Sequence, residues 1–276
     1  MAKTTAMAPQ EMWRRAVAPR RQYLLVGDME HGNSFIVNAL AQAFPVLAAA
    51  GFRHVGLEQD PKEHQGPLDA FQFASRSKKN AGQDMAALSE YANSYAISTA
   101  LISRQHMLAD CQARLSFIQQ ARQHGLRLHC LNPLKSFETY LEECGEQEVP
   151  KFMRFANYAF RHLAAPPRIS ASNLLKLDGY MEGYMAYNMA QDPQCAHALQ
   201  QVAGGQRAAL FFGAAHFRRE DGAGIEQSLP TGSSVLVVVG PAECVAQRLA
   251  QKNPVTWPDF ALETDSGRAM RVHRPL

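Results

Sequence analysis

Short apolar runs alternate with stretches of helical periodicity along the chain. The apolar runs stand at residues 22–26, 53–57, 126–131, 208–212 and 234–239, and each is followed by a glycine, a glutamate or an asparagine. Runs of this length that stop at a turn or polar residue are typical of buried strands. Between the first two runs, Ile36, Ala39, Leu40, Ala43 and Leu47 recur at helical spacing. This segment therefore predicts a strand–helix–strand unit, with a helix that is capped by Asn33 or Ser34 and ends at Gly51.

The rest of the pattern is mostly helical and completes an α/β fold. Residues 84–124 contain neither proline nor glycine and are expected to be helical. Further helices are expected at about 135–165, 170–190, 193–202 and 241–251. A short helix or arm is expected over 1–20, and an edge strand near 270–273. Because the strands alternate with helices, we predict a mostly parallel central sheet flanked by helices, in one domain spanning 1–276. A large helical insertion, about 135–205, separates the third and fourth predicted strands. Residues 59–83 lack a clear period and are predicted to form a lid.

Composition and charge exclude several classes of protein. The 276 residues are 46% apolar and carry a net charge of only +3, which suits a globular core and excludes a polybasic nucleic-acid-binding protein. The five cysteines are odd in number and far apart, which disfavours both a disulfide framework and a cysteine zinc site. No apolar run approaches the ~20 residues that span a bilayer, and no secretory signal is evident. We expect a cytoplasmic protein without a membrane span, although specialised secretion would leave no mark of this kind.

Polar residues that can do chemistry follow the predicted strands. Asp28 and His31 come after the first strand, Glu58 after the second, Asn132 after the third and His216 after the fourth. The carboxyl ends of parallel strands share one edge of a sheet, so these residues are expected to meet there, although Asn132 before a proline also suits a turn. His31, Glu58 and His216 are suitable ligands for a divalent metal ion. The same groups without a metal suit general acid–base hydrolysis.

A second feature is the run of tyrosines and methionines at 180–189. Tyr180, Tyr184 and Tyr187 stand at i, i+4 and i+7, on one face of a helix, whereas Glu182 and Asn188 lie on other faces. Two interpretations are open. The face packs in the core, or it forms one wall of a pocket for an amphiphilic ligand.

These residues resemble the motifs of the superfamily that unites erythromycin esterases, ChaN-like haem-binding proteins and the Tiki/TraB proteins. The first esterase motif, Gly-Glu-x-x-His-Gly, is similar to residues 27–32 with Asp28 in place of Glu, and the following Gly-Phe, strand and Glu match 51–58. The helical motif Arg-Asp-x-x-Met-Ala-x-Asn is similar to residues 181–188, with Met181 in place of Arg and Glu182 in place of Asp. The late Gly-x-x-His matches 213–216. The matches are in order and spread over about 22–240.

The resemblance implies a hydrolase-like core with His31, Glu58 and His216 in the site. It implies that water is activated either by a histidine, as in erythromycin esterases, or by a metal, as in Tiki proteins. We therefore predict a hydrolase of an ester or amide bond in a small-molecule or peptide substrate, with Asp28 also catalytic and with Glu182, Tyr184 and Asn188 at the substrate. The alternatives are a ChaN-like protein that binds haem or another ligand, and a catalytically silent protein that acts through protein contacts.

Overall fold

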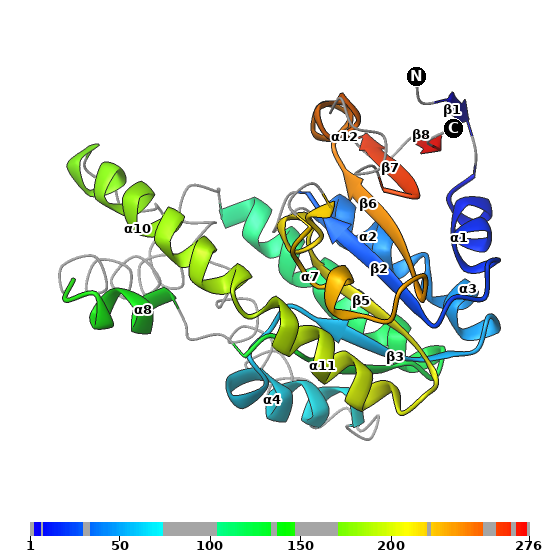
Figure 1. The fold of residues 1–276 in the computed structure, drawn as a ribbon, viewed down its shortest axis with the longest axis horizontal. Coiled ribbons are helices and arrows are strands. Elements are labelled where there is room, and N and C mark those ends of the chain that lie inside the picture. Colours follow the sequence, from blue (N-terminus) through cyan, green and yellow to red (C-terminus); the bar gives the residue numbers. More distant parts are fainter. Residues whose placement is uncertain are drawn as a thin grey trace.

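The structure is a computed structural model that describes most of the chain (Figure 1). The described residues are 3–6, 8–29, 34–73, 104–133, 137–146, 171–219, 222–250, 258–265 and 269–274. No helix among them combines the length and apolar composition needed to cross a membrane.

One eight-stranded sheet forms the centre of the fold. Its order is β1 (Lys3–Ala6), β8 (Ala269–Arg274), β7 (Phe260–Asp265), β6 (Ser234–Gly240), β2 (Tyr23–Asp28), β5 (Arg207–Gly213), β3 (Phe52–Leu57) and β4 (Arg127–Cys130). The six strands from β7 to β4 are parallel, whereas β8 and β1 pair antiparallel. The predicted α/β class with a mostly parallel sheet is confirmed.

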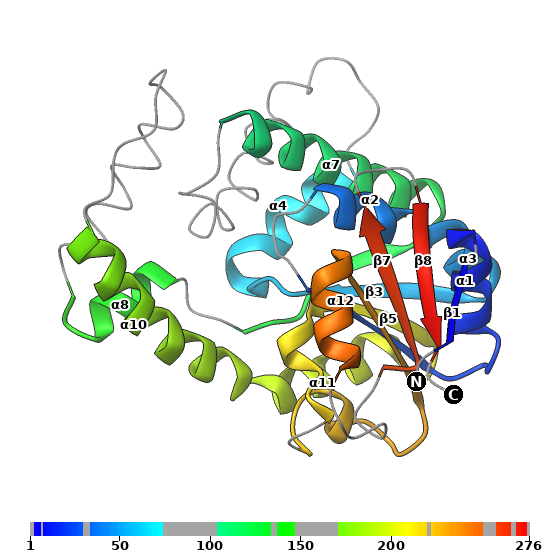
Figure 2. The ribbon, with the colours of Figure 1, turned by 90° about the horizontal axis from the view of Figure 1, so that it is seen from above.

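Helices cover both faces of the sheet (Figure 2). One face packs against α1 (Pro9–Val17), α2 (Ser34–Ala41), α3 (Phe44–Ala49), α4 (Pro61–Phe73) and α7 (Arg104–Gln123). The other face packs against α11 (Asp192–Ala203) and α12 (Ala242–Leu249). Because β2, β5 and β6 are covered on both sides, they are apolar at nearly every position rather than at alternate ones.

The chain between β4 and β5 contains helices that lie beside the sheet as well as on it. Its described parts are α8 (Phe137–Glu143), α10 (Ala171–Met189) and α11, and Figure 1 shows α8 and α10 to one side of the sheet. Tyr140 of α8 packs against Tyr184 and Tyr187 of α10, with ring centroids 5.4 and 6.0 Å apart. Residues 135–136 and 147–170 of the predicted insertion lie outside the described residues.

Three expectations need correction. The single helix predicted between residue 33 or 34 and Gly51 is two helices, α2 and α3, because Pro45 lies in the first turn of a new helix, α3. Strands β1 and β7 were not expected from the pattern. The first part of the predicted lid at 59–83 is instead the helix α4, which is docked on β4 and α7. Residues 74–83 of this segment lie outside the described residues, and so do residues 84–103 of the next predicted helix.

Two glutamines of α4 complete the hydrogen bonding of the edge strand β4. The Gln72 amide donates to the carbonyl of Leu126 at 2.7 Å and accepts from the Leu128 N–H at 3.2 Å. Gln65 accepts from the Cys130 N–H at 2.7 Å. Seven residues apart, the two glutamines share one helix face and take the place of a further strand.

Replacing Gln72 by alanine should therefore lower the free energy of unfolding by roughly 1–3 kcal/mol, because it leaves a buried donor and a buried acceptor unpaired. Urea denaturation of the Gln72→Ala variant measures this loss. The matched control is Gln119→Ala, which removes an exposed glutamine from α7. Equal losses in both variants would contradict the bridging role of Gln72.

Candidate functional site

The polar residues predicted at the strand ends are positioned by the register of the parallel strands. Asp28, the last residue of β2, lies beside Gly213 at the end of β5. Glu58 follows β3 directly, and its neighbour Leu57 lies beside Phe211 of β5. The short 3-10 helix η2 (Ala214–His216) then places a histidine at the same edge.

The structure brings Glu58 and His216 together, although 158 residues separate them. The Glu58 carboxylate accepts from His216 Nε2 at 3.0 Å and, through its other oxygen, from the backbone N–H of Gly213 at 2.5 Å. Asn188 Nδ2 donates to the first oxygen at 3.3 Å. The Glu58 side chain is only 10% exposed, so these donors compensate the loss of hydration that burial imposes on its charge.

His216 is held between two carboxylates. Its Nδ1 lies 2.5 Å from Asp192 Oδ1 at the start of α11, and its side chain is 2% exposed. Burial by itself lowers the pKa of His216, but the charges and hydrogen bonds of Glu58 and Asp192 outweigh it and raise the pKa to about 10. At neutral pH this ring is an imidazolium, so it holds Glu58 in place and cannot act as a general base.

Further buried polar groups extend the network away from His216. Asn132, which follows β4 and is fully buried, donates through its amide to Asn188 Oδ1 at 2.9 Å. Its own oxygen lies 3.5 Å from Cys195 Sγ. Burial is the main cause that raises the pKa of Cys195 far above the ordinary thiol range, so this cysteine is a neutral thiol rather than a nucleophile.

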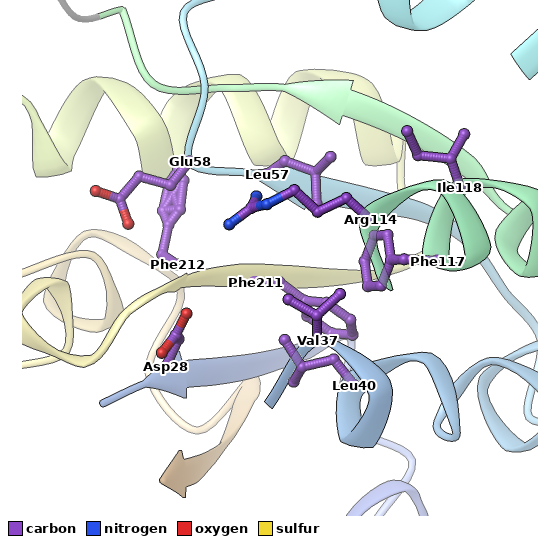
Figure 3. A pocket seen from close by; sticks show the side chains of 10 residues that line it. All are labelled: Asp28, Val37, Leu40, Leu57, Glu58, Arg114, Phe117, Ile118, Phe211 and Phe212. Atoms are coloured by element: carbon purple, nitrogen blue, oxygen red, sulfur yellow. The ribbon is translucent and has the colours of Figure 1, made fainter. Parts of the chain in front are cut away.

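A pocket opens between the sheet and the helices α2 and α7 (Figure 3). About 560 Å³ inside it is free of protein atoms, part of which is open to solvent. Asp28, Glu58 and Arg114 line the polar part of this pocket, and the remaining lining residues are Val37, Leu40, Leu57, Phe117, Ile118, Phe211 and Phe212. Figure 3 shows the Arg114 side chain extending from α7 toward the two carboxylates.

The other predicted site residues have different surroundings. His31 lies outside the described residues, three positions beyond Asp28. Glu182 is exposed on α10, and Tyr184 packs against tyrosines, so these two are not placed with Glu58. Asn188, by contrast, contacts Glu58 directly.

Sequence reasoning missed Asp192 and Arg114. Asp192 stands in the first turn of a helix, where an acidic residue is common for local reasons, so its partner in η2 left no signal in the sequence. Arg114, by contrast, left a detectable signal in the sequence. It lies three residues before Phe117 and four before Ile118, which places a charge on the apolar face of α7, and it is only 9% exposed.

As placed, His216 does not fit a metal site. Both of its ring nitrogens face carboxylate oxygens, so its side chain presents no uncommitted ligand atom. Within the described ranges there is no group of three or more His, Cys, Asp or Glu residues suited to a metal ion. Axial ligation of haem iron by His216 would require the same hydrogen bonds to break.

The comparisons with known proteins support the fold. No protein-family model and no curated protein matches the chain. Among solved structures, the chain is similar to the type III effector HopBA1, with a TM-score of 0.50 and 14% sequence identity over 87% of this chain and 86% of that one. At this identity the likeness concerns the fold alone, and the resemblance to erythromycin esterases, ChaN-like and Tiki proteins stays a prediction.

Proposed function

We propose that this chain is a hydrolase that cleaves an ester or amide bond with an activated water molecule. The observation that supports it best is Glu58, a buried carboxylate that three donors hold in place on the lining of a pocket. An ionised network in which a carboxylate, an imidazolium and a second carboxylate are buried together is costly, and such arrangements cluster at functional sites.

The proposed reaction assigns one task to each group. His31 takes a proton from water, the water oxygen forms a bond to the carbonyl carbon, and the carbon–oxygen or carbon–nitrogen bond breaks as His31 returns the proton to the leaving group. Glu58 orients the water, and Asp28 lies across the pocket on the strand that leads to His31. Asp192 and His216 act through Glu58 as positioning residues. The mechanism uses groups of the chain itself, because both ring nitrogens of His216 are hydrogen-bonded to carboxylates and offer no ligand atom to a metal ion.

Turnover of nitrophenyl esters and nitroanilides by the His31→Ala variant tests the proposal. We expect kcat/KM to fall by about 10²–10⁴, the usual loss when a general base is removed. His197→Ala is the matched control, because His197 is exposed on α11 and its partner there is Gln201.

Three outcomes would contradict parts of the proposal. A folded His31→Ala protein with full activity would remove His31 from the mechanism. Loss of wild-type activity with a chelator, and its recovery with added zinc, would show that the reaction needs a metal ion. Wild-type protein that turns over no ester or amide would favour a ligand carrier or a silent protein. The cytoplasmic location and a small-molecule or peptide partner stay predictions.

A further inference from the structure

The pocket beside Glu58 has two chemically different parts. Asp28, Glu58 and Arg114 lie at one end, whereas α2, α7 and β5 line the other with aliphatic and aromatic side chains such as Leu40, Phe117 and Phe211. An apolar group placed at the second end is removed from water, and a polar group attached to it meets the charged residues. This division predicts a ligand with one polar end and one apolar end.

Arg114 stands where the two parts meet. Its side chain is nearly buried, and Figure 3 shows it running past Leu57 from the apolar side toward Glu58 and Asp28. A guanidinium carries five N–H donors in a planar array, so it can hold a carboxylate and still donate to a carbonyl oxygen of a ligand. Its aliphatic stem packs among the apolar residues of the pocket wall.

Among the described residues around the pocket, the charges are matched. Asp28, Glu58 and Asp192 lie with Arg114, His216 and Arg218, and the Arg218 guanidinium is 3.9 Å from Asp192. Adding a net charge to a balanced, poorly hydrated site is unfavourable, because the new charge loses water and gains no unmatched partner. A neutral polar group is therefore preferred over an anion or a cation.

We propose that the substrates are neutral esters or amides of a small apolar acyl group, a short alkyl chain or an aromatic ring. The acyl group occupies the space between Leu40, Phe117 and Phe211, and the carbonyl oxygen accepts a hydrogen bond from Arg114. Arg114 is thus the residue that selects the carbonyl, and α2 and α7 select the acyl group. In taking the carbonyl as the reacting group, this inference rests on the proposed hydrolase.

Binding of simple amides tests the inference separately from turnover. Wild-type protein is titrated with benzamide, acetamide and benzoate, with binding followed in the ligand NMR signals. Each buried CH₂-sized group contributes about fourfold in affinity, so benzamide should bind at least about tenfold more tightly than acetamide. Benzamide should also bind more tightly than benzoate, which has the same ring and an added charge.

Two variants locate the ligand. Leu40→Trp fills the apolar end and should abolish benzamide binding, whereas Arg114→Gln should weaken it about tenfold. Arg122→Gln, an exposed position on the same helix, is the matched control and should bind like wild type. Should Arg114→Gln fail to fold, Arg114→Lys keeps the charge and loses the planar donor array, and a weaker affinity is again expected.

The outcomes separate this inference from the proposed function. Acetamide or benzoate binding as tightly as benzamide, or unchanged benzamide binding in Leu40→Trp, would overturn the assigned ligand class whether or not the protein hydrolyses anything. Benzamide binding with the expected variant pattern supports the pocket assignment even if no ester or amide is turned over. In that case the hydrolase proposal fails and the ligand class stands.

Discussion

Replacing Glu58 by glutamine should lower kcat/KM for any ester or amide substrate by about 10²–10⁴. The variant keeps the size of the side chain but removes the negative charge that orients water and that His216 neutralises. Activity assays on nitrophenyl esters measure the loss. Glu243→Gln, the same chemical change at an exposed position on α12, is the matched control and should keep wild-type activity.

The Glu58 variant should also be less stable. The two carboxylate oxygens accept from Gly213, His216 and Asn188, and a glutamine offers only one oxygen for these donors. One buried donor then faces the amide NH₂ group, which costs about 1–3 kcal/mol of the free energy of unfolding. Urea denaturation must therefore accompany the assay, and activity is compared where both proteins are folded. A folded Glu58→Gln protein with wild-type kcat/KM would remove Glu58 from catalysis.

Stability should fall steeply as the pH rises from about 6.5 to 10, because over this range the folded protein still binds the His216 proton that the unfolded chain has lost. Its pKa is raised from the ordinary 6.5 in the unfolded chain to about 10 in the folded one. A group whose pKa is higher in the folded state contributes stability that is fully present below the unfolded pKa and is lost as the pH passes the folded pKa. The shift corresponds to about 5 kcal/mol.

Free energies of unfolding from urea curves across this pH range measure the effect. Because cysteines, tyrosines and lysines also titrate there, the informative quantity is the difference between wild type and His216→Gln. The slope should be shallower in this variant, whereas His197→Gln, at an exposed position, should follow wild type. Parallel curves for wild type and His216→Gln would show that His216 is not the protonated centre of the network.

The sequence predicts strands well where both faces of the sheet are covered. Residues of β2, β5 and β6 are apolar almost without interruption, so the strands stand out from their surroundings. The strand β7 was missed because Glu263 and Thr264 are polar although the fold buries them. The strand β1 was missed because Lys-Thr-Thr-Ala carries no apolar pattern, and its pairing with β8 is set by tertiary structure.

The candidate site also contains some contacts that the sequence predicts and others that it does not. The meeting of Glu58 and His216 follows from topology, because both residues come just after parallel strands. The position of Asp192 does not follow, because it depends on how α11 packs on the sheet, and the sequence carries no sign of that contact. The raised pKa of His216 depends on the same contact, so the protonation state of the site could not be predicted from the sequence.

The two glutamines of α4 also decide where other chains can attach. An open sheet edge presents unpaired N–H and C=O groups to any extended strand, and this is a common route to strand addition and aggregation. Gln65 and Gln72 occupy those groups on β4, so this edge accepts another strand only if α4 first detaches from it. The eight-stranded sheet is thereby protected at its β4 edge, beside the strand β3 that leads to Glu58.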